Sequence, residues 1–142
     1  MEIAQLSIFI ENKSGRLSAV TKVLGDNNIN IRAMSASDTI DFGIFRLIVD
    51  KPELALEKLK AAGFTATITK AIAIGISDEP GALGKAMDVI RDNGLSVEYI
   101  YAFTNQKNLA YVILRLNDNQ KAIEILSQNG IQVISQAEIA AL

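Results

Sequence analysis

The hydrophobic period of the chain changes at Ser77-Asp78-Glu79-Pro80-Gly81-Ala82-Leu83. Before this stretch, Ile72, Ile74 and Ile76 alternate with smaller residues, which is the period-two pattern of a strand with one buried face. After it, apolar residues follow the i, i+3, i+4, i+7 spacing of an amphipathic helix. These residues are Leu83, Ala86, Met87 and Ile90. The stretch therefore predicts a turn that leads from a strand into a helix.

The residues of this turn have the chemistry of a binding loop. Pro80 suits the first turn of a helix, and Gly81 permits close backbone approach and a positive φ angle. Free amides at a helix start, around Gly81 and Ala82, favour an anion such as a carboxylate. Asp78 adds a carboxylate that can accept from an ammonium group. The alternative is that Asp78 only accepts from local amides as a helix cap, and that Pro80 and Gly81 serve backbone geometry alone.

The same pattern occurs twice in the chain. Gly15 and Leu17 align with Gly81 and Leu83 at an offset of 66 residues (81 − 15). Beyond a hairpin loop the offset becomes 67, which indicates an insertion of one residue. Apolar strand positions also align, namely Leu6 with Ile72, Ile8 with Ile74, Ile10 with Ile76, Phe45 with Val112, Leu47 with Leu114 and Val49 with Leu116. Such self-similarity predicts two copies of one structural unit.

Each copy is predicted to form a βαββαβ unit, the ferredoxin-like arrangement of the α+β class. We expect two such units side by side, each with two helices on one face of an antiparallel sheet. The expected domains are residues 1–69 and 70–142. In the first we expect strands at 3–10, 29–37, 42–50 and 64–69 and helices at 15–27 and 52–62. In the second we expect strands at 71–77, 95–104, 109–117 and 131–135, helices at 81–93 and 119–129, and a helical turn within 136–142.

Composition narrows the possible functions of the 142 residues. The chain has no His and no Cys, which removes the Ser-His-Asp and Cys-His mechanisms and the usual zinc sites. We therefore expect no catalytic residues, metal or cofactor. Fourteen basic and sixteen acidic residues, without a basic cluster, argue against a nucleic-acid partner. No apolar run approaches the roughly 20 residues of a membrane span, and no signal peptide is recognisable, so we expect a cytoplasmic protein.

The duplicated unit resembles the ACT domain, a small regulatory module of enzymes in amino-acid metabolism. The resemblance covers nearly the whole chain and rests on a strand, the motif D-x-P-G-x-L, an amphipathic helix and N-x-(I/L)-x-(I/V). The second copy, at 78–83, fits the motif fully. The first copy keeps Gly15 and Leu17 but has Asn12 in place of Asp and Ser14 in place of Pro. No catalytic domain accompanies the pair, which therefore looks like a stand-alone tandem ACT protein.

The resemblance implies a small ligand, usually an amino acid, bound at an interface between ACT units. We expect the loop from Asp78 through Pro80, Gly81 and Ala82 to Leu83 to meet the second strand of the first unit. That strand would contribute Ile31 and Ala33 to the site.

A mirror site would place the loop from Asn12 through Gly15 to Leu17 opposite the second strand of the other unit. Val97 and Tyr99, two apart on one strand face, would line it. Because this loop lacks the carboxylate, we expect weaker binding there.

Expected partners are a free amino acid, a regulated enzyme of amino-acid metabolism and a second copy of the chain. The homodimer rests on the helix-free sheet faces, which would carry Phe9, Tyr111 and Ile113 and need a cover. Two other functions stay open: an assembly scaffold with vestigial pockets, and a small enzyme on the same fold. The fold cannot decide between them, because ferredoxin-like units have many functions.

Overall fold

A computed structural model describes residues 1–11, 13–38, 42–105 and 107–142, which divide into two compact units. The N-terminal unit comprises Ala4–Thr69 with Ala140–Leu142, and the C-terminal unit comprises Met1–Ile3 with Lys70–Ile139. Apart from the chain ends, the division falls between Thr69 and Lys70. The first and last three residues, however, each group with the opposite repeat.

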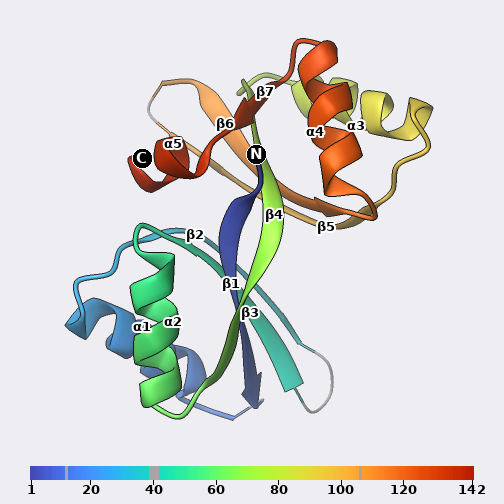
Figure 1. Ribbon diagram of the computed structural model, residues 1–142. Helices are drawn as coiled ribbons and strands as arrows, with labels where there is room; N and C mark the ends of the chain where they lie inside the picture. Colours follow the sequence, from blue (N-terminus) through green and yellow to red (C-terminus); the bar gives the residue numbers. More distant parts are fainter. Residues whose placement is uncertain (12, 39–41, 106) are drawn as a thin grey trace. The chain divides into compact units, whose positions relative to one another are not determined.

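The N-terminal unit is a four-stranded sheet covered on one face by two helices (Figure 1). Its elements are β1 (Ile3–Glu11), α1 (Arg16–Asp26), β2 (Ile31–Asp38), β3 (Phe42–Val49), α2 (Pro52–Ala61) and the first part of β4 (Thr65–Ser77). The strand order is β2-β3-β1-β4, and β3 runs antiparallel to both of its neighbours. Alternate residues of the strands meet the apolar faces of the helices in one core, which includes Leu6, Ile8, Leu24, Phe45 and Leu59.

The C-terminal unit repeats this arrangement with the remainder of β4 as its first strand. Its other elements are α3 (Ala82–Asp92), β5 (Val97–Thr104), β6 (Leu109–Leu116), α4 (Asn119–Gln128), β7 (Gln132–Ile134) and α5 (Gln136–Ala140). The strand order is β5-β6-β4-β7, the same order as in the first unit. The core includes Ile72, Ile74, Ile90, Leu114 and Leu126. The prediction of two ferredoxin-like βαββαβ units is confirmed.

Strand register places the two repeats in correspondence. In the N-terminal unit Glu11 pairs with Phe42, and in the C-terminal unit Ser77 pairs with Leu109. The first residues of these pairs differ by 66 positions and the second by 67 (109 − 42). Asp38 pairs with Gly43 and Thr104 with Ala110, with the same two offsets, so the one-residue insertion lies between the second and third strands of the unit. Residues can therefore be compared pairwise between the units.

Both first helices begin at a glycine in the left-handed region. Gly15 has φ 84° and Gly81 has φ 90°, and each is the N-cap of its helix. A residue with a Cβ atom adopts this conformation only at a cost, which is why glycine occurs in both copies. The prediction that Pro80 lies in the first helical turn is wrong, because the left-handed Gly81 delays the helix until Ala82.

A β-bulge interrupts the second strand of each unit. Ile31 pairs with Val49 whereas Ala33 pairs with Ile48, so the register shifts at the residue between them. Val49 and Ile48 are consecutive and face opposite sides of the sheet. Ile31 and Ala33 therefore lie on opposite faces, although their spacing by two predicts a shared one. The C-terminal unit has the same irregularity between Val97 and Tyr99.

The side chains predicted on the helix-free sheet faces are less exposed than a homodimer through these faces requires. Phe9 is 50% exposed, but Tyr111 is only 7% exposed and Ile113 is fully buried within the chain. Two of the three residues therefore cannot present an open apolar face to a partner. The ring of Tyr111 stacks on Phe103 at a centroid distance of 5.2 Å.

The short helix α5 begins with a capping box. The Glu138 carboxylate accepts hydrogen bonds from the amide and hydroxyl of Ser135, at 2.8 and 2.7 Å. In return the Ser135 hydroxyl accepts from the Glu138 amide at 3.2 Å. Ser-x-x-Glu is the sequence signature of such a start, and it could have predicted the helix.

Candidate functional site

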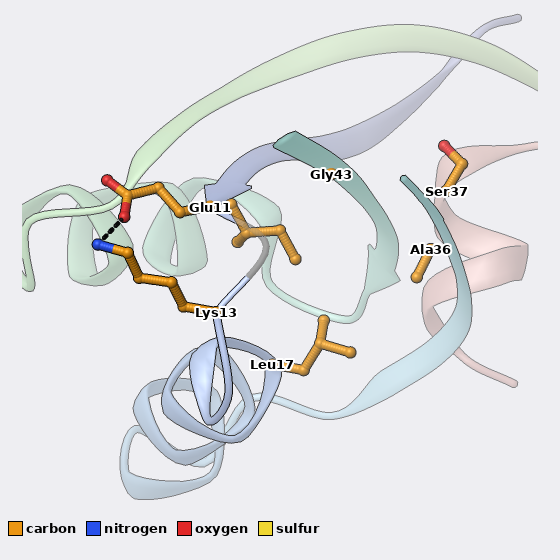
Figure 2. A pocket seen from close by; sticks show the side chains of 7 residues that line it. Glu11, Lys13, Leu17, Ala36, Ser37 and Gly43 are labelled. Carbon is orange, nitrogen blue, oxygen red and sulfur yellow. Dashed lines mark ion pairs between the residues drawn. The ribbon is translucent and has the colours of Figure 1, made fainter. Parts of the chain in front are cut away.

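A cavity of about 330 Å³ opens beside the loop that joins β1 to α1 in the N-terminal unit (Figure 2). It is lined by Ile10, Glu11, Lys13, Leu17, Ala36, Ser37 and Gly43. The side chain of Leu17 points from the start of α1 towards the strands that carry Ala36 and Gly43. The hollow thus lies between the helix start and strands β1, β2 and β3.

Gly43 leaves the space on the strand side of this cavity. A Cβ atom at this position would lie 3.3 Å from both Ile10 Cγ1 and the Ser37 carbonyl oxygen. Glycine inside a strand often marks such a close approach. The C-terminal unit has Ala110 at the corresponding position, where it pairs with Ile76. The larger residue places a methyl group where the N-terminal unit has none.

An ion pair stands at one side of the cavity. Lys13 Nζ lies 2.6 Å from Glu11 Oε2, and the two side chains are 72% and 44% exposed. The hydrogen bond and the charge of Lys13 lower the pKa of Glu11, and the nearby charge of Arg16 lowers it further. Glu11 therefore stays ionised at neutral pH, and the cavity has one negative and one positive group beside its apolar wall.

In the loop of the C-terminal unit, Asp78 is exposed and its amide donates to the Asn108 carbonyl oxygen at 2.9 Å. Among the described residues, its carboxylate has no hydrogen bond or ion pair, and no side chain caps α3. The alternative in which Asp78 serves as a cap is thus not realised. Its carboxylate remains available to a ligand, although Asp78 does not line the N-terminal cavity.

The remaining predicted site residues are dispersed within their units. Ile31 and Val97 pack against the core of their respective unit, and Ala33 is buried at 7% exposure. Leu17 and Leu83, at equivalent positions, are 44% and 40% exposed beside the two loops. Asn12 lies outside the described residues.

Several residues of the N-terminal cavity were missed from the sequence. Glu11 and Lys13 flank Asn12, and such a pair of opposite charges does not by itself predict a site, because pairs of this kind are common on surfaces. Gly43, the second residue of β3, was the signal that could have been used, since glycine in a strand often marks a close approach. Ala36 lines the cavity because β2 pairs with β3, which places Ala36 opposite Phe45.

Within the described residues, no group of three or more acidic residues is placed to hold a metal ion. No helix in the described part of the chain is long and apolar enough to cross a membrane.

Comparison with known proteins decides the family. The model of the ACT domain pair matches residues 1–142. This chain belongs to the ACT domain pair family. The ACT domain pair also resembles protein BT0572 from Bacteroides thetaiotaomicron, with 39% sequence identity and a TM-score of 0.95 over 100% of this chain and 98% of that one.

More distant relatives of the ACT domain pair share its fold. The ligand-free regulatory subunit of aspartate kinase from Thermus thermophilus has a TM-score of 0.63 and 18% identity, over 88% of this chain and 91% of that one. The regulatory subunit from Thermus flavus has a TM-score of 0.60 and 16% identity, over 90% and 92%. No curated protein matches this chain. At these identities the likeness shows the shared fold alone.

Proposed function

We propose that this ACT domain pair is a non-catalytic regulatory module that binds a free amino acid at the loops between first strand and first helix. The observation that supports this most is the cavity beside the loop of the N-terminal unit. Its wall is apolar at Ile10, Leu17 and Ala36, and Glu11 and Lys13 stand at its side. A zwitterion with an apolar side chain needs both kinds of surface.

The charged groups have complementary roles in this proposal. The ammonium of Lys13 attracts the ligand carboxylate, and the carboxylate of Glu11 accepts from the ligand ammonium. Binding replaces their mutual ion pair, which costs little because exposed ion pairs contribute only about 0–1 kcal/mol. The apolar side chain of the ligand then covers Leu17, which is otherwise 44% exposed. This favours small or medium apolar amino acids.

The loop of the C-terminal unit provides a second site in the proposal. The Asp78 carboxylate would accept from the ligand ammonium, and the amides at the start of α3, around Gly81 and Ala82, would donate to its carboxylate. The predicted contacts from the second strands are left out of this proposal, because Ile31 and Val97 pack against the cores of their units and Ala33 is buried.

A second copy of the chain is the proposed cover for both loops. Each unit exposes two large apolar side chains, one on its first helix and one in its edge strand, namely Leu17 and Met34 in the N-terminal unit and Leu83 and Ile100 in the C-terminal unit. The pairs are equivalent, since both members differ by 66 positions (83 − 17 and 100 − 34). Apolar surface at the same place in both repeats favours a symmetric partner, as in a homodimer. The regulated protein would be an enzyme of amino-acid metabolism.

The alternative is an assembly scaffold whose pockets are vestigial. A thermal-shift screen against the twenty amino acids separates the two functions. Ligand at one hundred times its Kd stabilises the native state by about 2.7 kcal/mol, which is a clear rise in Tm. If light scattering shows that the chain is oligomeric and its Tm rises with none of the twenty amino acids, the chain is a scaffold.

Calorimetry on Asp78→Asn tests the second site. Loss of a charge-assisted hydrogen bond at an exposed group should weaken binding about tenfold, the lower end of the usual range. Asp88→Asn, on the outer surface of α3, is the matched control and should leave the affinity unchanged. Equal affinities in the two variants would restrict ligand binding to the N-terminal loop.

A further inference from the structure

The C-terminal unit has a cavity of about 280 Å³ on a different side of its first helix. It borders the turn between α4 and β7, whereas the N-terminal cavity borders β2 and β3. Ile76, Ala86 and Ile131 form its apolar part. Its polar part consists of Ser77, Glu79 and Lys85, and the remaining lining residues are Gly75, Pro80, Ala82 and Gly130.

The N-terminal unit fills the corresponding place with its own side chains. The guanidinium carbon of Arg16 lies 5.6 Å from the centroid of the Phe64 ring, which is a cation–π distance. Arg16 Nε is buried and has no hydrogen-bond partner among the described residues. Phe64 in turn packs against the core of the unit. In the N-terminal unit, the space beside the start of α1 is thus filled by the Arg16 guanidinium over the Phe64 ring.

Both of these side chains are replaced in the C-terminal unit. Ala82 stands at the position of Arg16 (offset 66) and Ile131 at that of Phe64 (offset 67). The backbone is the same, because Phe64 N donates to the Leu59 carbonyl and Ile131 N to the Leu126 carbonyl, each at 3.0 Å. The cavity is therefore the space that a guanidinium and a ring occupy in the other repeat.

We propose that this cavity binds a free basic amino acid, with a guanidinium side chain in the place that Arg16 fills in the other unit. The Glu79 carboxylate, at the mouth with its Oε2 3.4 Å from the Ser77 hydroxyl, is the counter-charge for the guanidinium. The methylene stem of the ligand covers Ala86 and Ile131. The ammonium of Lys85 attracts the ligand α-carboxylate. The cavity shares Ala82 and the loop before α3 with the second site of the proposed function, so this inference rests on that proposal and names the ligand class of that loop; all of its lining residues belong to one unit.

Two-dimensional NMR of the full chain with L-arginine, and with L-citrulline as its neutral isostere, tests the proposal. Arginine should shift the amides of Gly130, Ile131 and Lys85, and citrulline should bind roughly two- to fivefold more weakly, because it has no charge to pair with Glu79. Glu79→Gln should weaken arginine binding roughly two- to fivefold, as expected for an exposed ion pair. Equal binding of arginine and citrulline, or no shift at these amides with millimolar arginine, would overturn the proposal.

A filled cavity is the decisive variant. Ala82→Arg places in the C-terminal unit the guanidinium that the N-terminal unit already has, so it should abolish the arginine-dependent shifts. Ala82→Leu fills the same space without a charge and serves if the first variant does not fold by circular dichroism. Gly43→Ala, which narrows the N-terminal cavity, is the matched control and should leave these shifts unchanged. Arginine binding that survives a folded cavity-filling variant would refute the site, whatever the amino-acid screen finds for the loops.

Discussion

The two units of this chain share a fold and differ in where they are hollow. In the N-terminal unit the space beside the first helix opens towards β2 and β3, because Gly43 has no side chain there. In the C-terminal unit the space opens towards the turn between α4 and β7, because Ala82 and Ile131 are smaller than their counterparts in the N-terminal unit. Arg16 and Phe64 occupy that second place in the N-terminal unit.

This difference shows that the duplicated fold and the cavities follow different residues. The fold depends on the apolar alternation and on Gly15 and Gly81, which both copies retain. The cavities depend on side-chain volume at a few wall positions, which the copies do not share. Two binding sites of different chemistry can therefore arise from one repeated unit without a change in backbone.

The largest effect is expected for a core position that differs between the units. Phe45 is fully buried, and Val112 at the equivalent position is 1% exposed. Phe45→Ala should destabilise the N-terminal unit by about 3–5 kcal/mol through the cavity it leaves. Val112→Ala removes less volume and should cost about 2 kcal/mol. Hydrogen exchange during urea unfolding measures the free energy of unfolding of each unit separately. Equal losses of stability in the two variants would contradict the expectation that the larger deleted side chain costs more.

The next effect concerns the cavity of the N-terminal unit. Gly43→Ala should weaken amino-acid binding at the loop of this unit about tenfold or more, because one added carbon in a tight pocket costs about 1–3 kcal/mol. Ala110→Gly makes the reverse exchange in the C-terminal unit and should not weaken binding at the N-terminal loop. Titration calorimetry on both variants decides; unchanged affinity in Gly43→Ala would place the ligand elsewhere.

A smaller and equal effect is expected at the two helix starts. Gly15→Ala and Gly81→Ala each force a Cβ atom into a left-handed conformation, with φ 84° and 90°, at a cost of about 1–2 kcal/mol. Gly25 lies inside α1 with no atom within 4 Å of an added Cβ, so Gly25→Ala should instead stabilise, by about 0.4–1 kcal/mol. Thermal unfolding compares the three, and a stabilising Gly81→Ala would contradict the left-handed start.

The smallest effect concerns α5, which has no helical counterpart in the first repeat. Hydrogen bonds from the Ser135 hydroxyl and amide lower the pKa of Glu138. Because the folded pKa lies below the unfolded one, this contribution is complete above the usual Glu range and is lost as the pH falls below about 4. The protection factor of the Ile139 amide, which corrects for the pH dependence of intrinsic exchange, should therefore fall in acid. In Glu138→Gln this fall should be absent, whereas a fall of the same size would assign it to another group.

Much of the fold could be predicted because it depends on local periodicity. Strand alternation, helical spacing and the repeat offset are properties of neighbouring residues, and they gave both units in the right order. The wrong predictions occur where a single residue shifts the periodicity of a strand or the start of a helix. The bulge between Ile31 and Ala33 reverses the face of the strand, and the left-handed Gly81 moves the helix start past Pro80.

The candidate site was less predictable, since its walls come from separate strands. Asp78 was selected from a motif, and its binding role stays a prediction. Glu11 and Lys13 needed the structure, because their pairing at 2.6 Å beside a cavity depends on the path of the loop. Gly43 could have been suspected from its place inside a strand.

The sequence by itself determined the duplicated βαββαβ fold, the glycine helix starts and the absence of His and Cys chemistry. These depend on residue type and on spacing along the chain. Only the tertiary structure decided where each unit is hollow. A cavity is the volume that side chains from several distant segments leave unfilled, and its size changes when one of them, such as Arg16 or Ala82, differs. No local sequence pattern therefore predicts the volume that these side chains leave unfilled.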